Sequence, residues 1–150
     1  MSNENINNLI NNVRKHIASH GWQVLGVPSE DRPCFAYTIG LMETFGHPEI
    51  IMSGLDIELM QHLLNDIGDL IKNGETFNDG QLVGQIVENE KVRFKGINSV
   101  QVTEYLRLAE VYYEDTNVKA IQCQWSDESG YFPEEKQCSI EVNNQQGLFV

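Results

Sequence analysis

The stretch Phe35–Leu41 constrains the fold of this 150-residue chain more than any other. Large residues (Phe35, Tyr37 and Ile39) alternate with small ones, so a strand here places bulky side chains on one face and small side chains on the other. The small face leaves room for either a closely packed helix or a ligand. Gly40, which tolerates backbone conformations that a side chain would prevent, ends the strand. We therefore predict that this stretch is the architectural centre of the molecule and one wall of a recess.

Size and composition fit one globular domain. The mass is 17.1 kDa, with 41% hydrophobic and 21% charged residues, and no apolar run approaches the roughly 20 residues that a membrane-spanning helix needs. The amino terminus lacks the basic and apolar regions of a secretory signal. Cys34, Cys123 and Cys138 are odd in number and form no Cys-x-x-Cys pair, which argues against disulfides and a thiolate zinc site. We expect a cytoplasmic protein with reduced thiols.

The chain is strongly acidic. Ten Lys and Arg against 22 Asp and Glu give a formal net charge of −12. This charge repels the phosphate backbone of DNA and RNA, so a nucleic-acid partner is not expected. The same charge favours a basic partner without identifying one.

Hydrophobic periodicity predicts a single α+β domain. Strands occur both before and between helices and include a hairpin, which favours a mainly antiparallel sheet covered by two or three helices. The glycine-rich turn of a dinucleotide-binding fold is absent. We expect helices at about 5–20, 56–72 and 100–113, strands at about 22–27, 35–41, 49–53, 82–87, 92–97 and 118–125, and a polar irregular segment at about 126–150.

Four motifs in this order resemble the domain of unknown function 4262 family: Tyr37–Leu41, Gly46–Glu49, Gln122–Asp127 and Gly130–Pro133. The resemblance extends from about Gly21 to the carboxyl end and implies one compact domain from a set of small, mostly bacterial and phage-associated proteins without a settled activity. The chain departs from the family pattern at Ser126, where a proline is usual, and at 145–148. The matching positions are Tyr37, Thr38, Gly40, His47, Pro48, Glu49, Gln122, Asp127, Gly130 and Pro133.

His47, Glu49 and Asp127 supply the parts of a general acid–base pair or of a mixed nitrogen and oxygen metal site. The simpler interpretation is a His-Pro turn whose imidazole caps backbone groups, with Glu49 solvated. His16 and His20 lie four residues apart on a predicted helix and could share a metal, but cations near a helix carboxyl end are also stabilised by its dipole. No common hydrolase, P-loop or zinc-protease signature occurs, and we assign no metal and no cofactor.

Lys91, Arg93 and Lys95 are spaced by two along a predicted strand, so their side chains share one face. This basic row could receive a phosphate or carboxylate, for which the fork of an arginine is well suited. Lysines on an edge strand also prevent unwanted strand pairing, so a purely protective role stays open.

These observations lead us to expect a non-enzymatic protein that recognises or sequesters a small anionic metabolite or nucleotide. One alternative is an anti-defence or immunity-type antagonist of a basic partner protein, and another is a hydrolase that uses His47 with Glu49 or Asp127. Whether the chain forms a homodimer is open, and no membrane partner is expected. The predicted ligand-binding residues are Tyr37, Thr38, Gly40, His47, Glu49, Arg93, Gln122 and Asp127.

Overall fold

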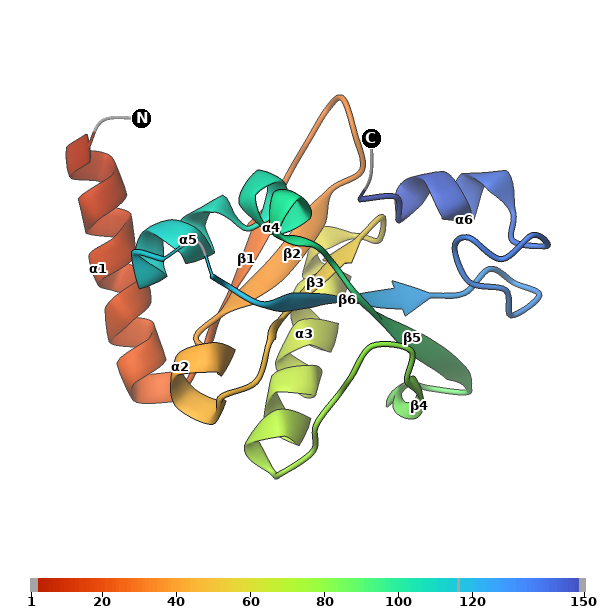
Figure 1. Ribbon diagram of the computed structural model, residues 1–150, viewed down its shortest axis with the longest axis horizontal. Helices are drawn as coiled ribbons and strands as arrows, with labels where there is room; N and C mark the ends of the chain where they lie inside the picture. The colour runs from red at the N-terminus through yellow and green to blue at the C-terminus, as the bar shows by residue number, and fades with distance from the viewer. Residues whose placement is uncertain (1–2, 116, 149–150) are drawn as a thin grey trace.

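The computed structural model describes residues 3–115 and 117–148 and confirms the α+β class. A six-stranded sheet runs through the molecule, with α1 and α6 at opposite ends of its long axis (Figure 1). The elements are α1 (Asn3–His20), β1 (Gln23–Val27), β2 (Phe35–Ile39), α2 (Leu41–Phe45), β3 (Glu49–Ser53), α3 (Ile57–Lys72), β4 (Leu82–Val87), β5 (Glu90–Gly96), α4 (Ser99–Tyr105), α5 (Arg107–Tyr113), β6 (Ala120–Trp125) and α6 (Ile140–Gln145).

The strand order is β1-β2-β3-β6-β5-β4. Four of the pairings are antiparallel, as the sequence predicts, and the β3–β6 pairing is parallel. This parallel pair aligns Ile50 with Ile121. The connection between these strands includes α3, the β4–β5 hairpin, α4 and α5, and a parallel pair requires a crossover of this kind. Strands β2, β3 and β6 therefore lie at the buried centre.

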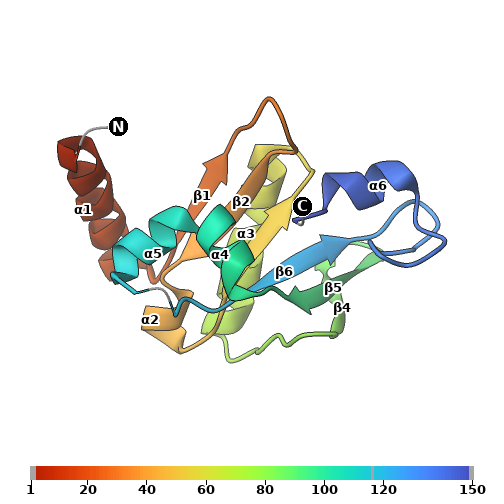
Figure 2. The same ribbon diagram turned by 45° about the horizontal axis from the view of Figure 1, so that its top comes forward.

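The small face of β2 is covered by α3, which crosses behind the sheet (Figure 2). Ala36 has no exposed surface and lies in the same apolar cluster as Met60, Leu64 and Ile67 of the helix. At Gly68 the helix approaches Trp22 so closely that a Cβ would lie 2.4 Å from the indole. A helix thus fills the room beside this strand, which is the packing alternative raised by the sequence.

The large face of β2 packs against α1, α4 and α5. Tyr37 is 3% exposed and its hydroxyl accepts a hydrogen bond from the Leu108 backbone N–H at 3.2 Å. Burial raises the pKa of Tyr37 to about 12, so the phenol stays neutral in ordinary buffers. The helix expected at 100–113 is divided at Leu106, whose φ of −102° and ψ of 45° are not helical and whose side chain is fully buried. Burial of this leucine in the core accompanies the break.

The carboxyl-terminal segment lies beyond the end of β6 and carries α6 (Figure 2). The Ser139 hydroxyl caps this helix by accepting a hydrogen bond from the Val142 N–H at 3.1 Å. Hydrophobic periodicity does not predict the helix, because none of its residues is buried. Gly54, with a φ of 89°, lets α6 approach: a Cβ there would lie 2.6 Å from the Gln145 carbonyl oxygen. No helix in the described ranges combines the length and apolar character needed to cross a membrane.

Candidate binding site

Glu49 organises the corner where β2 passes through α2 into β3. Its side chain is completely buried. Both carboxylate oxygens accept hydrogen bonds that close the corner from three directions. The donors are the hydroxyls of Thr38 (2.8 Å) and Tyr113 (2.6 Å) and the backbone N–H groups of Gly40 (3.1 Å), Leu41 (3.1 Å) and Met42 (3.2 Å).

This corner joins three of the predicted ligand-binding residues through internal hydrogen bonds. Burial raises the pKa of Glu49, while the bonds from Tyr113, Thr38 and the backbone act against that rise. Gly40 has a φ of 114°, and a Cβ at this position would lie 2.8 Å from the carbonyl oxygen of Gly21. The strand can therefore turn toward the carboxylate only with glycine here. Glu49 is not solvated in this arrangement, and its oxygens are used to hold the turn.

His47 is 4% exposed and lies next to Phe77. Its Nδ1 lies 2.8 Å from the Pro48 carbonyl oxygen, and its Nε2 lies 2.9 Å from the Phe77 backbone nitrogen. The carbonyl can only accept and the N–H can only donate, so these contacts require the neutral tautomer with its proton on Nδ1. The imidazole therefore caps backbone groups, as in the simpler interpretation of the His-Pro turn.

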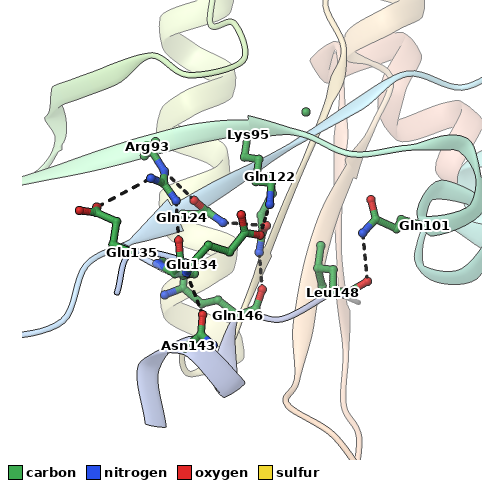
Figure 3. A network of polar contacts seen from close by, with 12 residues as sticks. Arg93, Lys95, Gln101, Gln122, Gln124, Glu134, Glu135, Asn143, Gln146 and Leu148 are labelled. Atoms are coloured by element: carbon green, nitrogen blue, oxygen red, sulfur yellow. Dashed lines mark hydrogen bonds and ion pairs between the residues drawn. The ribbon is translucent and has the colours of Figure 1, made fainter. Parts of the chain in front are cut away.

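A layer of three glutamines, Gln122, Gln124 and Gln146, joins β6 to the carboxyl-terminal segment (Figure 3). Gln122 has no exposed surface, and its amide donates to the Gln146 carbonyl at 2.8 Å, while its side-chain oxygen accepts from Gln124 at 3.2 Å. The Gln146 amide accepts from the backbone N–H of Trp125 and donates to its carbonyl, at 2.8 and 2.7 Å. The β3–β6 pairing ends at Gln122, and the Gln146 side chain provides the hydrogen-bond partners of the β6 backbone at Trp125.

Arg93 lies on the same polar layer (Figure 3) and is about a quarter exposed. Its Nε donates to the Gln124 side-chain oxygen at 2.9 Å, and its Nη2 donates to the Pro133 carbonyl at 2.6 Å. The guanidinium also stacks over the Phe132 ring, 5.2 Å from its centroid. The third nitrogen, Nη1, forms an ion pair with a Glu135 carboxylate oxygen at 3.7 Å, a distance too long for a hydrogen bond. Arg93 is therefore fixed in orientation and retains donor capacity.

The basic row has the predicted alternation. Val92 and Phe94 are buried, whereas Lys91 is exposed and Lys95 is partly exposed. Lys95 pairs with Glu134 of the carboxyl-terminal segment. The ammonium of Lys91 has no hydrogen-bond or ion-pair partner among the residues that the structure describes. The row is thus covered by acidic residues at one end and open at the other.

Asp127 holds the loop that follows β6. Its carboxylate accepts from the backbone N–H groups of Ser129 (3.0 Å), Tyr131 (2.9 Å) and Ser139 (2.9 Å). The N–H groups of Tyr131 and Ser139 are the main reason why the pKa of Asp127 lies below its usual range. Unlike Glu49, this carboxylate is not sequestered in the core, and it fixes a loop at the surface.

A cavity of about 860 Å³, which we call the hairpin cavity, lies between the β4–β5 hairpin and this loop. Arg93 and Asp127 both line it, so the structure brings two predicted site residues from distant parts of the chain to one opening. Its charged lining residues are Glu90, Lys91, Arg93, Asp127, Glu128 and Glu135. The Glu135 carboxylate accepts a hydrogen bond from the Phe132 N–H at 3.0 Å. Like Asp127, it is therefore held by a backbone donor of the same loop.

The predicted site residues thus fall into separate groups. Thr38, Gly40 and Glu49 meet at the corner, and Tyr37 and His47 contact other backbone groups. Gln122 lies in the glutamine layer, and Arg93 and Asp127 line the hairpin cavity. Sequence reasoning did not identify Tyr113, Gln124, Gln146 or Phe132. Of these, only Gln124 could have been found from the sequence, because it lies two residues after Gln122 on a predicted strand and so shares its face.

Across residues 3–115 and 117–148, no three His, Cys, Asp or Glu side chains converge as metal ligands would. His16 and His20 stack with their ring centroids 4.8 Å apart. Burial strongly raises the pKa of the Cys123 thiol, which disfavours the nucleophilic thiolate.

Comparison with known proteins supports the family resemblance. A family model described as "Domain of unknown function (DUF4262)" matches residues 16–139, most of the chain. No curated protein and no solved structure matches the chain.

Proposed function

We propose that this chain, which belongs to the DUF4262 family, is a non-enzymatic binding protein that recognises a small anionic metabolite or nucleotide in the hairpin cavity. The observation that carries this proposal is the orientation of Arg93 at that cavity. Its Nε and Nη2 donate hydrogen bonds to protein acceptors, while Nη1 makes only an ion pair with Glu135, at 3.7 Å. A guanidinium fixed in this way is preorganised to receive a carboxylate or phosphate.

The remaining lining residues refine the ligand class. Lys91 adds a second cation two residues before Arg93 on the same face of the hairpin. The carboxylates of Asp127 and Glu135 are engaged by backbone N–H groups, whereas Glu90 and Glu128 are exposed. Such a lining suits a molecule that combines one anionic group with hydrogen-bond donors. Nucleotides and amino acids both have this combination.

A binding role without catalysis is supported by the engagement of His47 and Glu49. Both ring nitrogens of His47 contact backbone groups, and the Glu49 carboxylate accepts five hydrogen bonds in the core. A general base must reach the proton that it removes, and neither group can do so while these bonds persist. A hydrolase built on His47 would first have to open this corner.

Calorimetric titration with adenosine monophosphate and with glutamate tests the proposal, with adenosine as the matched probe that lacks the phosphate. We expect at least one anionic probe to bind and adenosine to bind more weakly. Arg93→Lys and Lys91→Gln should each weaken binding, by about tenfold for the arginine because a lysine cannot reproduce its fork geometry. Lys72→Gln, at the end of α3 and outside the cavity, should bind like the parent. If neither anion binds, or if both cavity variants match the parent, the proposal fails.

A second candidate is an antagonist of a basic partner protein, in keeping with an anti-defence or immunity-type role. It is favoured by the net charge of −12 and by the four carboxylates that line the hairpin cavity. Charge complementarity of this kind speeds association and is screened by salt. Co-purification of a partner that is released at high ionic strength would favour this function over small-molecule binding.

A further inference from the structure

Arg107 differs from the other arginines of the chain in its surroundings. Arg14 lies over the Tyr112 ring, Arg32 bonds to Glu104, and Arg93 bonds to Gln124 and Pro133. Arg107, the first residue of α5, is exposed. Its guanidinium has no hydrogen-bond, ion-pair or ring partner within residues 3–115 and 117–148. In a protein of net charge −12, a cation without an internal partner is available to an external anion.

A cavity of about 870 Å³ adjoins this side chain, and we call it the α4–α5 groove. Its charged residues are Arg32, Arg107 and Glu104, and the single carboxylate is paired with Arg32 at 3.3 Å. The lining of this groove therefore carries one excess positive charge, in contrast to the hairpin cavity and to the protein as a whole. On its other side, Arg107 borders a hollow that is lined by Glu110, Glu114 and Asp115. The α4–α5 groove and the hairpin cavity have no lining residue in common.

Arg32 is positioned by aromatic stacking. Its guanidinium carbon lies 4.8 Å from the centroid of the Tyr105 ring and 5.7 Å from that of Phe35. These contacts hold an arginine from the β1–β2 loop beside the groove formed by α4 and α5. A planar guanidinium that stacks on aromatic faces loses little further freedom when it binds an oxyanion.

Neutral donors complete the lining of the groove. Ser99 and Thr103 contribute hydroxyls and Asn117 contributes an amide. The Thr103 hydroxyl lies 3.1 Å from a Glu110 carboxylate oxygen, so Ser99 and Asn117 are the neutral groups that remain for a ligand. Two guanidinium groups, a hydroxyl and an amide match the several acceptor oxygens of a phosphoryl group.

We propose that the α4–α5 groove binds a phosphoryl group, with Arg107 as its principal cation and Arg32 as the second. The proposal is independent of the hairpin cavity and does not rest on the function proposed for it. A carboxylate, with two oxygens and one charge, should bind more weakly than a phosphate dianion.

Nuclear magnetic resonance titration of the whole chain with inorganic phosphate at constant ionic strength tests this site, with acetate as the matched anion. We expect saturable shifts of the backbone amides of Ser99, Thr103, Arg107 and Asn117, and at least roughly tenfold weaker binding of acetate. Arg107→Gln should weaken phosphate binding about tenfold, a change of about 1.4 kcal/mol. Because Arg107 is exposed, we expect this variant to fold like the parent.

Arg14→Gln is the matched control, because it removes an arginine that does not line the groove. It should bind phosphate like the parent. The proposal is overturned if the shifts do not saturate or if Arg107→Gln and Arg14→Gln behave alike. Amides of Ser126 and Gly130 report separately on the hairpin cavity, so failure at one site can be distinguished from failure at the other.

Discussion

The corner around Glu49 and the loop around Asp127 use the same device in opposite environments. In each, one carboxylate collects three backbone N–H groups and fixes the path of the chain. Glu49 is fully buried and receives two hydroxyl donors in addition. Asp127 lies at the surface, beside a cavity. The corner is therefore part of the core, whereas the loop can present groups to a ligand.

The difference also appears in the titration of the two carboxyl groups. Burial raises the pKa of Glu49, and backbone N–H groups lower the pKa of Asp127. A buried carboxylate whose oxygens are already satisfied has little capacity for a ligand. Asp127 is partly exposed and orders a loop that borders the hairpin cavity. Glu49 and Asp127 both belong to the family motifs, yet one lies in the core and the other at the surface.

The largest expected effect is that of Glu49→Ala. The substitution leaves the N–H groups of Leu41 and Met42 without an acceptor and leaves that of Gly40 with the Tyr113 hydroxyl alone, so we expect the free energy of unfolding to fall by about 3 to 5 kcal/mol. Urea denaturation measures this loss. Glu58→Ala, an exposed acidic position in the first turn of α3, should lower it by no more than about 1 kcal/mol, the usual contribution of a carboxylate near a helix amino terminus. Equal effects of the two substitutions would show that the corner contributes no more than surface charge.

Asp127→Ala should act locally. The amide protons of Ser129, Tyr131 and Ser139 lose their acceptor, so their hydrogen exchange should accelerate about tenfold or more while exchange in β6 stays close to that of the parent. Glu128→Ala is the control, because this neighbouring carboxylate is exposed and accepts no hydrogen bond from the described residues. Acceleration throughout the sheet would mean that the loop and the core unfold together.

The smallest expected effect is a divergence of the two regions with pH. The lowered pKa of Asp127 means that its stabilising contribution is present above the ordinary aspartate range and is lost as the pH falls through the native value. For Glu49, whose pKa is raised, the contribution is greatest at low pH and declines as the pH rises through the native value. Hydrogen exchange, corrected for its intrinsic pH dependence, should therefore show the loop opening before the corner on acidification. The reverse order would contradict these opposite directions.

Much of the fold follows from local patterns. The periodicities at 5–20 and 56–72 correspond to α1 and α3, and the alternation around Tyr37 corresponds to β2. Two short helices were not predicted, since α2 has five residues and α6 buries none. The parallel β3–β6 pairing was also beyond reach, because about 70 residues separate the strands and no local pattern specifies such a partner.

The candidate site shows the same limit more sharply. The spacing of Lys91, Arg93 and Lys95 correctly predicts a basic row on one strand face. It contains no information that Pro133 and Glu135 approach Arg93 from a distant loop. Likewise, nothing local relates Tyr113 to Glu49 across 64 residues.

By itself, the sequence determined the α+β class, the central strand and the alternation of its faces, because hydrophobic periodicity is a local consequence of backbone geometry. Only the tertiary structure decided which polar residues are used internally and which face a cavity. In the sequence, Thr38, His47 and Glu49 are polar residues like those that line the cavity. The fold nevertheless buries them and supplies their hydrogen-bond partners. A buried polar group must find a partner, and the partners come from elsewhere in the chain.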